Sequence, residues 1–560
     1  MSASQHRHPH LLGILVALSA LMVGCDSSPP PHTTEAQAPA STYVPQPVWC
    51  ADGSGALCPV IPSFIGPDPA IQKNNGYQGL SNDVTSARFD AQTPFDNMSW
   101  QMFIALNWQA SQSGGDPKTG LSGAGPTVWQ SYARPEDLFG GPSGNCPNPN
   151  NLPRFNVIAK SGAQGSRDEE FIQATGQPLI DVNGNWTLFE RRLNSVEQTY
   201  LETKGLTTYA GQQTFVQAGH TVQFPPGDDT IPNGQVGAIE IKAAWRIISD
   251  AEKSTYFNTP GLIDVQGAYV RDGQPLCAEV TLGLVGLHIV QNNSEFESLR
   301  GQSIWASFEH KNNAPMAAAA CAATDPNCYK TIPNSLCPAP ANAGDYAFSR
   351  NACNAVTTNS PPVLGQGESA FIWERQAPYA QTYLTQSNGQ SCGTQVAHCW
   401  QVYDLTQQLN SAWQAQLTAI DSVFANYYLI GTNWGGFVEP DGTQLDNQAV
   451  PAFLANSTLE TFIQHDPVIG NCVGCHKGAT LAYTETDPNT GKVTQFPADF
   501  SFLPGLATQQ TCTDQNAGPI FSNDQAQQVC PSVCSAVEDS WNGQWTTTVF
   551  EVMSVCGCCG

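Results

Sequence analysis

The sequence predicts an α+β fold: a large, loop-rich, disulfide-containing body of mixed helices and sheet, followed by a small, disulfide-rich, β-containing module. Three observations carry this prediction. The chain has 560 residues, enough for a large core and more than one domain. Only 12% of its residues are charged, and its 49 glycines and 41 prolines favour long connections over a helical bundle. Its 19 cysteines are typical of exported proteins held together by disulfide bonds.

The first 47 residues predict export and a tether. Residues 11–23 form an apolar run that is too short to span a bilayer and suits the core of a signal peptide. The run ends in Leu21-Met22-Val23-Gly24-Cys25, which resembles the bacterial lipobox. This resemblance implies a lipoprotein signal peptide over 1–24 and a lipid on Cys25; cleavage to a soluble periplasmic protein is the alternative. The proline-rich residues 25–47 predict an extended tether. We therefore expect an exported, membrane-anchored lipoprotein, periplasmic or at the cell surface, with inner or outer membrane left open.

Two helices are predicted within the body, which spans residues 48–506. The first is expected to begin near Phe95-Asp96, because four apolar residues share one helical face: Trp100, Phe103, Ile104 and Leu106. The second covers residues 404–429, where apolar residues recur every three or four positions. Between the first helix and the rest of the body, residues 110–155 are rich in Gly, Pro and Asn and are expected to form a long surface excursion.

Three runs rich in β-branched and aromatic residues predict a buried sheet, at residues 236–248, 279–290 and 304–308. Residues 312–366 lack periodicity and contain several cysteines, so we expect an insertion pinned by disulfides. The tryptophans of the body, including Trp305, are expected to fill the core rather than to relay electrons.

Cys472-Val473-Gly474-Cys475-His476 has the Cys-x-x-Cys-His pattern by which a c-type haem is attached. Two cysteines at this spacing can each form a thioether with a haem vinyl group, and His476 can bind the iron from the proximal side. The predicted cofactor is one covalent haem c, held by Cys472, Cys475 and His476. Two other interpretations stay open: half of a zinc site, which requires a second Cys/His pair, and a thioredoxin-like dithiol, which does not require the histidine.

The sequence leaves the distal side of the iron open. Small cytochromes c usually use a downstream methionine, but none follows the motif until Met553 in the C-terminal module. The candidate distal ligands are His310, at a predicted strand end, and His288, which would otherwise be a hydrogen-bonded histidine of the core. The remaining possibilities are an unfilled position and three methionines: Met98, Met102 and Met316. His398 and His465 are expected at the surface. A histidine not bound to iron could act as a distal acid–base group.

Cysteine counting supports an oxidising compartment. Without Cys25, Cys472 and Cys475, 16 cysteines remain, ten before the motif and six after it. Both numbers are even, so each group can close its own disulfides. Three short loops are expected: Cys50–Cys58, Cys321–Cys328 and Cys392–Cys399. The pairing of the last six stays open.

The formal charge of the chain is −25, and no basic run occurs. A strongly acidic chain of this kind does not attract nucleic acid or anionic lipid, so we expect no nucleic-acid partner. Contact with a membrane is expected through the N-terminal lipid instead.

Several segments of the body resemble a family of exported bacterial proteins that carry one c-type haem. They are residues 96–100, 106–108, 239–245, 283–290, 307–310, 454–460 and 498–503. The resemblance covers most of residues 90–505. It implies one haem-bearing body rather than a small cytochrome appended to another domain.

Residues 507–560 form the second module, and three of its motifs occur in the order of a known repeat. They are a Gly-Pro-x-aromatic-Ser-Asn-x-x-Ala-Gln start at 518–527, a Gly-Gln-Trp-x-Thr strand at 543–547 and a Met-Ser-Val end at 553–555. Over residues 516–556 these motifs resemble the cyanobacterial oligomannose- and mannan-binding lectin family. The resemblance implies binding to mannose-containing glycans. The candidate carbohydrate-binding residues are Phe521, Asn523, Asp524, Asn542, Gly543, Gln544, Trp545 and Thr546.

The module departs from this family in three ways. Phe521 replaces the usual tryptophan, cysteines replace small residues, and one repeat is present where the lectin has two. A core this small is expected to need its disulfides. The alternative is that the aromatic residues only fill this core and the module is a structural cap.

Three functions follow from these features. The first is an exported, lipid-anchored c-type cytochrome that transfers electrons to or from an unidentified redox partner and has a glycan-binding tail. The second is a haem oxidase or peroxidase-like enzyme that its tail holds on mannose-rich glycan. The third is a surface lectin or adhesin with a structural haem. The sequence favours electron transfer, and it leaves open whether the protein is an enzyme.

Overall fold

The computed structural model describes residues 57–62, 84–112, 114–140, 146–157, 178–227, 235–292, 303–316, 344–353, 356–361, 372–380, 384–385, 391–400, 402–434, 453–466, 469–507, 512–537, 540–549 and 552–559. The predicted signal peptide, Cys25, the tether and the predicted Cys321–Cys328 loop lie outside these ranges. Within them, no helix has both the length and the apolarity to cross a bilayer.

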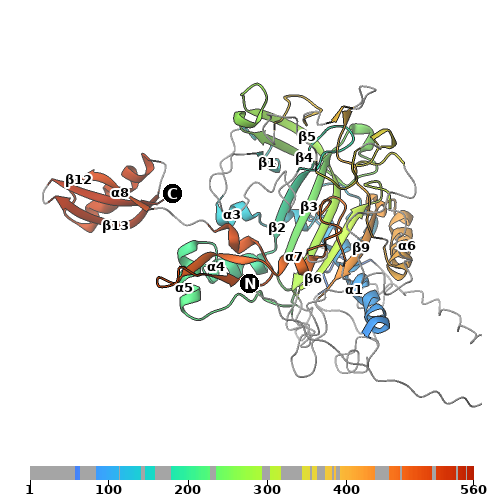
Figure 1. Ribbon diagram of the computed structural model, residues 1–560, viewed down its shortest axis with the longest axis horizontal. Helices are drawn as coiled ribbons and strands as arrows, with labels where there is room; N and C mark the ends of the chain where they lie inside the picture. Colours follow the sequence, from blue (N-terminus) through green and yellow to red (C-terminus); the bar gives the residue numbers. More distant parts are fainter. Residues whose placement is uncertain are drawn as a thin grey trace, which may run out of the picture. The chain divides into compact units, whose positions relative to one another are not determined.

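A seven-stranded sheet forms the centre of the body (Figure 1). Its strands are β1 (Arg154–Val157), β2 (Leu188–Leu193), β3 (Ile239–Ile247), β4 (Asn258–Val265), β5 (Leu276–Asn292), β6 (Ser303–His310) and β9 (Tyr427–Asn433). Five of them run in the order β1-β4-β5-β3-β2, while β6 pairs with β5 and with β9. The β1–β4 pair is parallel and the other pairs are antiparallel.

The three predicted strands are confirmed as β3, β5 and β6, and they are neighbours in the sheet. Strand β5 is longer than predicted, with 17 residues. Its first half pairs with β4 and its second half pairs with β3 and β6. The long apolar run therefore crosses the whole core, which is why its central residues are buried.

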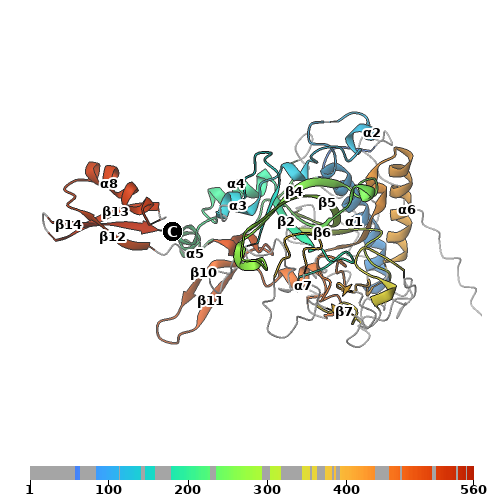
Figure 2. The ribbon, with the colours of Figure 1, turned by 90° about the horizontal axis from the view of Figure 1, so that it is seen from above.

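Helices α1 (Val84–Leu106) and α6 (Asp404–Ala419) pack together on one side of the sheet (Figure 2). Helix α1 begins earlier than predicted, and its expected buried face is confirmed. Trp100 stacks on Trp413 of α6, with ring centroids 5.8 Å apart, and meets Phe308 of β6 edge-on at 5.1 Å. These aromatic contacts fix both helices against β6.

The predicted helix over 404–429 is wrong beyond Ala419. Asp421 adopts a left-handed backbone with φ of 57°, which a helix cannot continue through. A 3₁₀ turn, η8 (Val423–Asn426), follows, and the chain then enters β9. The apolar residues at 427–430 belong to β9, most of which is buried against β6, and they do not continue the helix.

The excursion over 110–155 is also more structured than predicted. It contains α2 (Pro117–Gly120), η2 (Trp129–Ser131) and α3 (Pro135–Phe139), and Trp129 is fully buried against Trp245. A smaller cluster of the body is formed around α4 (Ser195–Thr203), α5 (Tyr209–Gln217), η9 (Leu503–Leu506) and the hairpin of β10 (Thr480–Thr486) and β11 (Val493–Pro497). The remaining elements are η3 (Asp250–Glu252), η4 (Gly267–Tyr269), η7 (Asn351–Cys353), β7 (Leu384–Thr385), β8 (Ser391–Cys392) and α7 (Cys472–His476).

The disulfides of the body link residues that are distant in sequence. Cys146 pairs with Cys277 and Cys353 pairs with Cys392. The predicted Cys392–Cys399 loop is therefore wrong, although Cys399 is also disulfide-bonded. Cys58 has a free thiol, which contradicts its predicted pairing with Cys50. Cys353 belongs to the predicted insertion, and its disulfide to Cys392 pins this segment to β8, as expected. The segment also contributes to the core, because Phe348 is fully buried.

The C-terminal module is a three-stranded antiparallel sheet covered by one helix. Its elements are β12 (Cys512–Gly518), α8 (Asn523–Ser535), β13 (Ser540–Val549) and β14 (Met553–Cys559), with the strand order β12-β14-β13. Two disulfides, Cys530–Cys556 and Cys534–Cys558, attach α8 to the central strand. All four sulfur-bearing side chains are buried in the core of the module, as expected for a core that depends on its disulfides.

Candidate functional sites

The central sheet has two chemically different faces. On β6, Ile304, Ala306, Phe308 and His310 face α1 and the large apolar core, whereas Trp305, Ser307 and Glu309 face the other way. Cross-strand partners share a face, and His288 lies opposite both Ser307 and Lys242. We call the face that carries Lys242, His288, Trp305, Ser307 and Glu309 the motif face, because the Cys-x-x-Cys-His residues lie on it.

The motif itself forms a single helical segment, α7, on this face. Asn471 caps it: its side-chain oxygen accepts a hydrogen bond from the amide of Gly474 at 2.6 Å. Asn433 at the end of β9 accepts from the amide of Val473 at 3.0 Å, which ties α7 to the sheet. Neither Cys472 nor Cys475 is part of a disulfide, and Cys472 is buried while Cys475 is partly exposed. Two thiols are thus presented one helical turn apart.

The His476 ring is held by one hydrogen bond from a ring nitrogen and by contacts with two aromatic rings. Its Nδ1 lies 2.8 Å from the carbonyl oxygen of Phe500, so Nδ1–H donates and Nε2 carries the lone pair. The ring lies against Trp305, with centroids 4.4 Å apart, and against Phe502 at 4.9 Å. Asp499 and Phe500 have positive φ angles of 49° and 66°, a backbone that side chains of this kind rarely adopt. This turn aims the Phe500 carbonyl at His476.

Burial and the charges around α7 favour a neutral His476 and a neutral Cys472 thiol. Burial, aided by the neighbouring Lys242 and His288 side chains, lowers the pKa of His476 to about 4. Burial, together with the negative charge of Glu460, raises the pKa of Cys472 well above its usual value. The first cysteine of a reactive dithiol has a lowered pKa instead, so the thioredoxin-like interpretation does not fit. As to the zinc interpretation, within the described ranges no three His, Cys, Asp or Glu side chains are grouped to hold a metal ion.

These residues fit a covalently attached haem. A metal-binding histidine usually donates its second ring N–H to a carbonyl or carboxylate, which orients the ring and fixes the tautomer. His476 makes this bond to Phe500 and leaves Nε2, the nitrogen that binds haem iron, without a proton. Apolar side chains beside the two thiols add a low-dielectric environment: Trp305, Val402, Ile430, Leu454, Val473 and Phe500.

His288 lies on the motif face beside Glu460. Its Nε2 is buried and has no hydrogen-bond partner, although Glu460 Oε2 is 3.3 Å away. At that distance the two side chains can form an ion pair when the imidazole is protonated. Burial raises the pKa of Glu460, but His288 and Lys242 lower it by more, so the net pKa is below the usual value. Glu460 and Lys242 were missed in the sequence as site residues, although both lie in segments that carry the family resemblance.

His310 is on the opposite face, away from the motif. Its Nε2 donates to the carbonyl of Thr255 at 2.9 Å, and its Nδ1 accepts from the amide of Asn312 at 3.2 Å. It also stacks on Tyr256 at 3.9 Å. Burial lowers its pKa to about 4. Both ring nitrogens are occupied, so the structure places His310 in the core and not beside the motif.

The three methionines considered as iron ligands also lie on different faces of the sheet. Met98 and Met102 of α1 are buried in the core on the opposite side of the sheet. Met316 packs against the cluster that contains Trp305 and Cys472, so it lies near the motif. His398, expected at the surface, is instead almost fully buried, whereas His465 is partly exposed.

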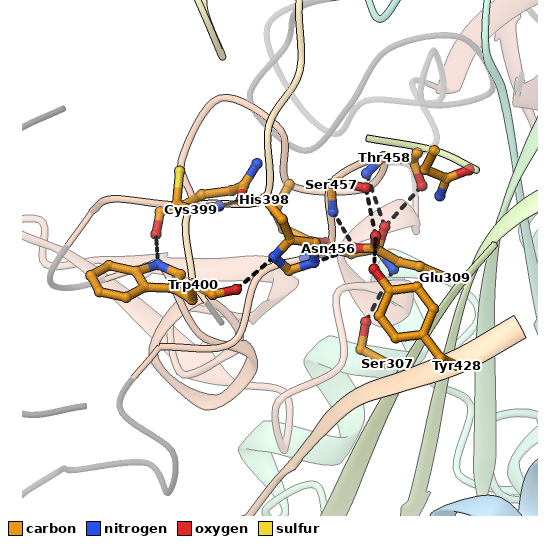
Figure 3. A network of polar contacts seen from close by, with 12 residues as sticks. Ser307, Glu309, His398, Cys399, Trp400, Tyr428, Asn456, Ser457 and Thr458 are labelled. Carbon is orange, nitrogen blue, oxygen red and sulfur yellow. Dashed lines mark hydrogen bonds and ion pairs between the residues drawn. The ribbon is translucent and has the colours of Figure 1, made fainter. Parts of the chain in front are cut away.

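A buried polar network fixes the segment that leads to the motif (Figure 3). Glu309 accepts hydrogen bonds from the amide and the hydroxyl of Ser457, at 2.5 and 2.7 Å, and lies 3.0 Å from His398 Nε2. His398 Nδ1–H donates to the carbonyl of Trp400 at 3.1 Å. Burial lowers the pKa of His398, but Glu309 and the Trp400 carbonyl outweigh it, so the net pKa is raised.

The same segment makes a close approach to β5. Asn456 donates to the hydroxyl of Ser307 at 3.1 Å and to the carbonyl of Phe308 at 3.0 Å. A Cβ atom at Gly286 would come within 2.4 Å of the Thr458 hydroxyl, so only glycine fits opposite this turn. The segments at 239–245, 283–290, 307–310, 454–460 and 498–503, which carry the family resemblance, therefore converge around α7.

In the C-terminal module, the candidate sugar-binding residues are spread over two elements. Phe521 precedes α8 and is 65% exposed, and Thr546 on β13 is exposed as well. Asn523 and Asp524 lie in the first turn of α8. Asn542, Gly543 and Gln544 lie within β13, where four residues of β13 span two of β14, so they bulge from the ladder.

The two tryptophans of the module are partly used by its core. Trp541 and Trp545 pair with Cys558 and Cys556, whose disulfides reach α8, so both indoles lie on the side that the helix covers. Both are partly buried against the core of the module. Phe521 is therefore the large aromatic residue of the described module that is most available to a ligand.

Comparisons with known proteins identify this module. Residues 523–558 match the family described as mannan-binding protein. The lectin MVL of Microcystis viridis is 51% identical over 39 residues, which are 7% of this chain and 34% of the lectin. The chain thus spans about a third of the length of this curated relative. No solved structure matches the chain. The C-terminal module of this protein is similar to mannan-binding lectins.

Proposed function

We propose that the body is a c-type cytochrome that transfers electrons. The bond from His476 to Phe500 carries this proposal, because it leaves the Nε2 lone pair for iron beside two cysteines that are not in disulfides. When bound, haem supplies a centre that takes up and releases one electron. Cys472 and Cys475 would hold it through thioethers. Trp305 and Phe502 both contact the His476 ring and hold it in place. The acid–base groups Glu309 and His398 are already occupied by hydrogen bonds to other residues. Because neither group is available to a substrate, electron transfer is favoured over catalysis.

Covalent attachment is tested by mass. The full chain is produced in a strain competent for cytochrome c maturation, denatured and extracted with acidic acetone. We expect the polypeptide to stay coloured and to carry the mass of one haem. The variant Cys472→Ser/Cys475→Ser should lose both signals. Cys58→Ser removes another free thiol and serves as the matched control, which should keep them. A colourless wild-type protein without added mass would refute the haem.

We also propose that the chain is exported and anchored by a lipid on Cys25, in the periplasm or at the cell surface. The apolar run before Cys25 and the disulfides of the body support this location. Metabolic labelling with a fatty acid tests it. The label should enter the wild-type protein and be absent from Cys25→Ala. Release of unlabelled wild-type protein into the soluble fraction would contradict the lipid anchor.

The second proposed function is binding of mannose-containing glycans by residues 512–559. The match to mannan-binding proteins supports it, and the exposed Phe521 offers a ring on which a sugar can stack. One module gives one attachment point, so the affinity should be that of a single site.

A glycan array with the oxidised full chain tests this function. We expect retention of mannose-containing glycans and weaker retention by Phe521→Ala. Val552→Ala is the matched control, because Val552 is similarly exposed, at 60% against 65%, in another part of the module. If the wild-type chain retains none of these glycans, the module is a structural cap.

A further inference from the structure

We propose that His288 is the second axial ligand of the haem, opposite His476. This inference rests on the proposed haem attachment and deepens it. It assigns the side of the iron that the sequence leaves open. Its chemical consequence is an iron centre closed by two imidazoles, which suits electron transfer rather than binding of a small substrate.

The pairing of the strands brings His288 to the motif. His288 on β5 lies opposite Ser307 on β6, two residues from Trp305, and Trp305 contacts the His476 ring at 4.4 Å. Side chains alternate along a strand, so His288 and Trp305 share the motif face, whereas His310 lies on the other face. Glu460, which precedes the motif in the chain, lies beside His288, with its Oε2 3.3 Å from the Nε2 of that ring.

The state of the His288 ring is the second observation. His288 is 9% exposed, and its Nε2 makes no hydrogen bond, with the carboxylate of Glu460 as an ion-pair partner at 3.3 Å. A buried polar nitrogen that lacks a hydrogen bond costs about 1–3 kcal/mol, which the ion pair offsets only in part. Nε2 is the nitrogen through which histidine binds haem iron. A bond to the iron would satisfy it.

Other described residues near the motif are less suited to this role. His398 uses both ring nitrogens, on Glu309 and on the Trp400 carbonyl. Met316, which packs near Trp305, is the main rival, because a thioether can also bind haem iron. Lys242 and Glu460 lie beside His288 and would set its charge environment.

The test is spectroscopic and uses the purified holo-protein. Wild-type ferric protein should be low-spin, its electron paramagnetic resonance should show two histidine ligands, and the ferrous form should not bind carbon monoxide. His288→Ala should keep the covalent haem mass but become high-spin and bind carbon monoxide. Added imidazole should restore the low-spin spectrum. Met316→Leu and the control His220→Ala, an exposed histidine, should leave the spectrum unchanged.

Several outcomes would overturn the assignment. A high-spin wild-type protein, or a resonance of histidine–methionine type, excludes His288 without any variant, so the test stands even if His288→Ala fails to fold. A low-spin His288→Ala, or loss of the low-spin state in Met316→Leu, excludes it as well. Absence of haem mass from the wild type would instead refute the proposed attachment, so the two failures are distinguishable.

Discussion

The imidazole of His476 and the indole of Trp305 lie in contact, with ring centroids 4.4 Å apart. One comes from a five-residue helix and the other from the central sheet, so this contact joins the motif to the sheet. Trp305 is 4% exposed and packs in the same cluster as Cys472. The predicted place of Trp305 in the core is confirmed, and its position beside the motif gives it a further role as a support for His476.

Removing this support should destabilise the body. Trp305→Ala deletes a buried indole, and we expect a loss of about 3–5 kcal/mol in the free energy of unfolding. Trp305→Phe keeps an aromatic ring against His476 and should cost less. Chemical denaturation of both variants checks this, and equal losses would show that the ring contact contributes nothing.

The pair of Glu309 and His398 should make stability depend on pH. The folded pKa of His398 is raised, so its contribution is complete below the unfolded value near 6.5 and is lost as pH rises through the folded pKa. Glu309→Gln removes one partner of a buried pair and should cost about 3–5 kcal/mol at pH 6. Thermal unfolding across the pH range checks this.

The matched control for this pair is Asp272→Asn, which removes an exposed partner of Arg375. It should change stability by less than about 1 kcal/mol. If the Glu309→Gln protein keeps the pH dependence of the wild type above pH 6.5, another group is responsible for it.

A second pH effect is expected where Glu197 of α4 lies beside Glu240 of β3. Burial, followed by the charge of Glu240, raises the pKa of Glu197 well above its usual value, and burial also raises the pKa of Glu240. The folded state therefore holds a proton that the unfolded state releases, and stability falls as pH rises through the folded pKa. Glu197→Gln mimics the protonated form and should raise the melting temperature at neutral pH.

The same variant should leave the melting temperature at acidic pH, below about 4, nearly unchanged, since Glu197 is protonated there in both states. Glu202→Gln, an exposed acid on the same helix, is the control and should have no such pH-dependent effect. A lower melting temperature of Glu197→Gln at neutral pH would contradict the shared proton.

The disulfides of the C-terminal module should decide its stability. Cys530 and Cys556 are separated by 26 residues, and replacing both by serine should cost about 3 kcal/mol. Because that is large for a core of this size, we expect loss of the near-ultraviolet signal of its tryptophans and of glycan retention. Replacing Cys353 and Cys392 in the body should leave glycan retention intact, and the opposite result would place the binding site elsewhere.

The sequence predicted those parts of the body in which local pattern and burial agree. The apolar runs that became β3, β5 and β6 are central strands, and the helical face of Trp100 and Phe103 is buried as expected. The end of the second helix could not be predicted, because the left-handed turn at Asp421 interrupts an apolar pattern that continues into β9. The disulfide between Cys353 and Cys392 depends on tertiary contact and not on spacing.

The choice between His288 and His310 shows the same limit at the site. Both histidines occur in apolar strands, and the sequence favoured His310 because it ends its strand. The face that each histidine occupies follows from the pairing of β5 with β6. His288 lies opposite Ser307 and shares its face, whereas His310 points to the other face of the sheet. Since a shift of one residue exchanges the two faces, the register had to be known before the histidines could be distinguished.

The left-handed turn at Asp499 and Phe500 has a consequence for engineering. Each of these residues is held in a conformation that costs on the order of 1–3 kcal/mol, which glycine would avoid. Substituting glycine would thus look attractive in a search for thermostable variants. It would also let the peptide rotate, and the carbonyl that orients the His476 imidazole would lose its fixed direction. Resistance to heat and a fixed orientation of this ring are therefore opposed at this one turn.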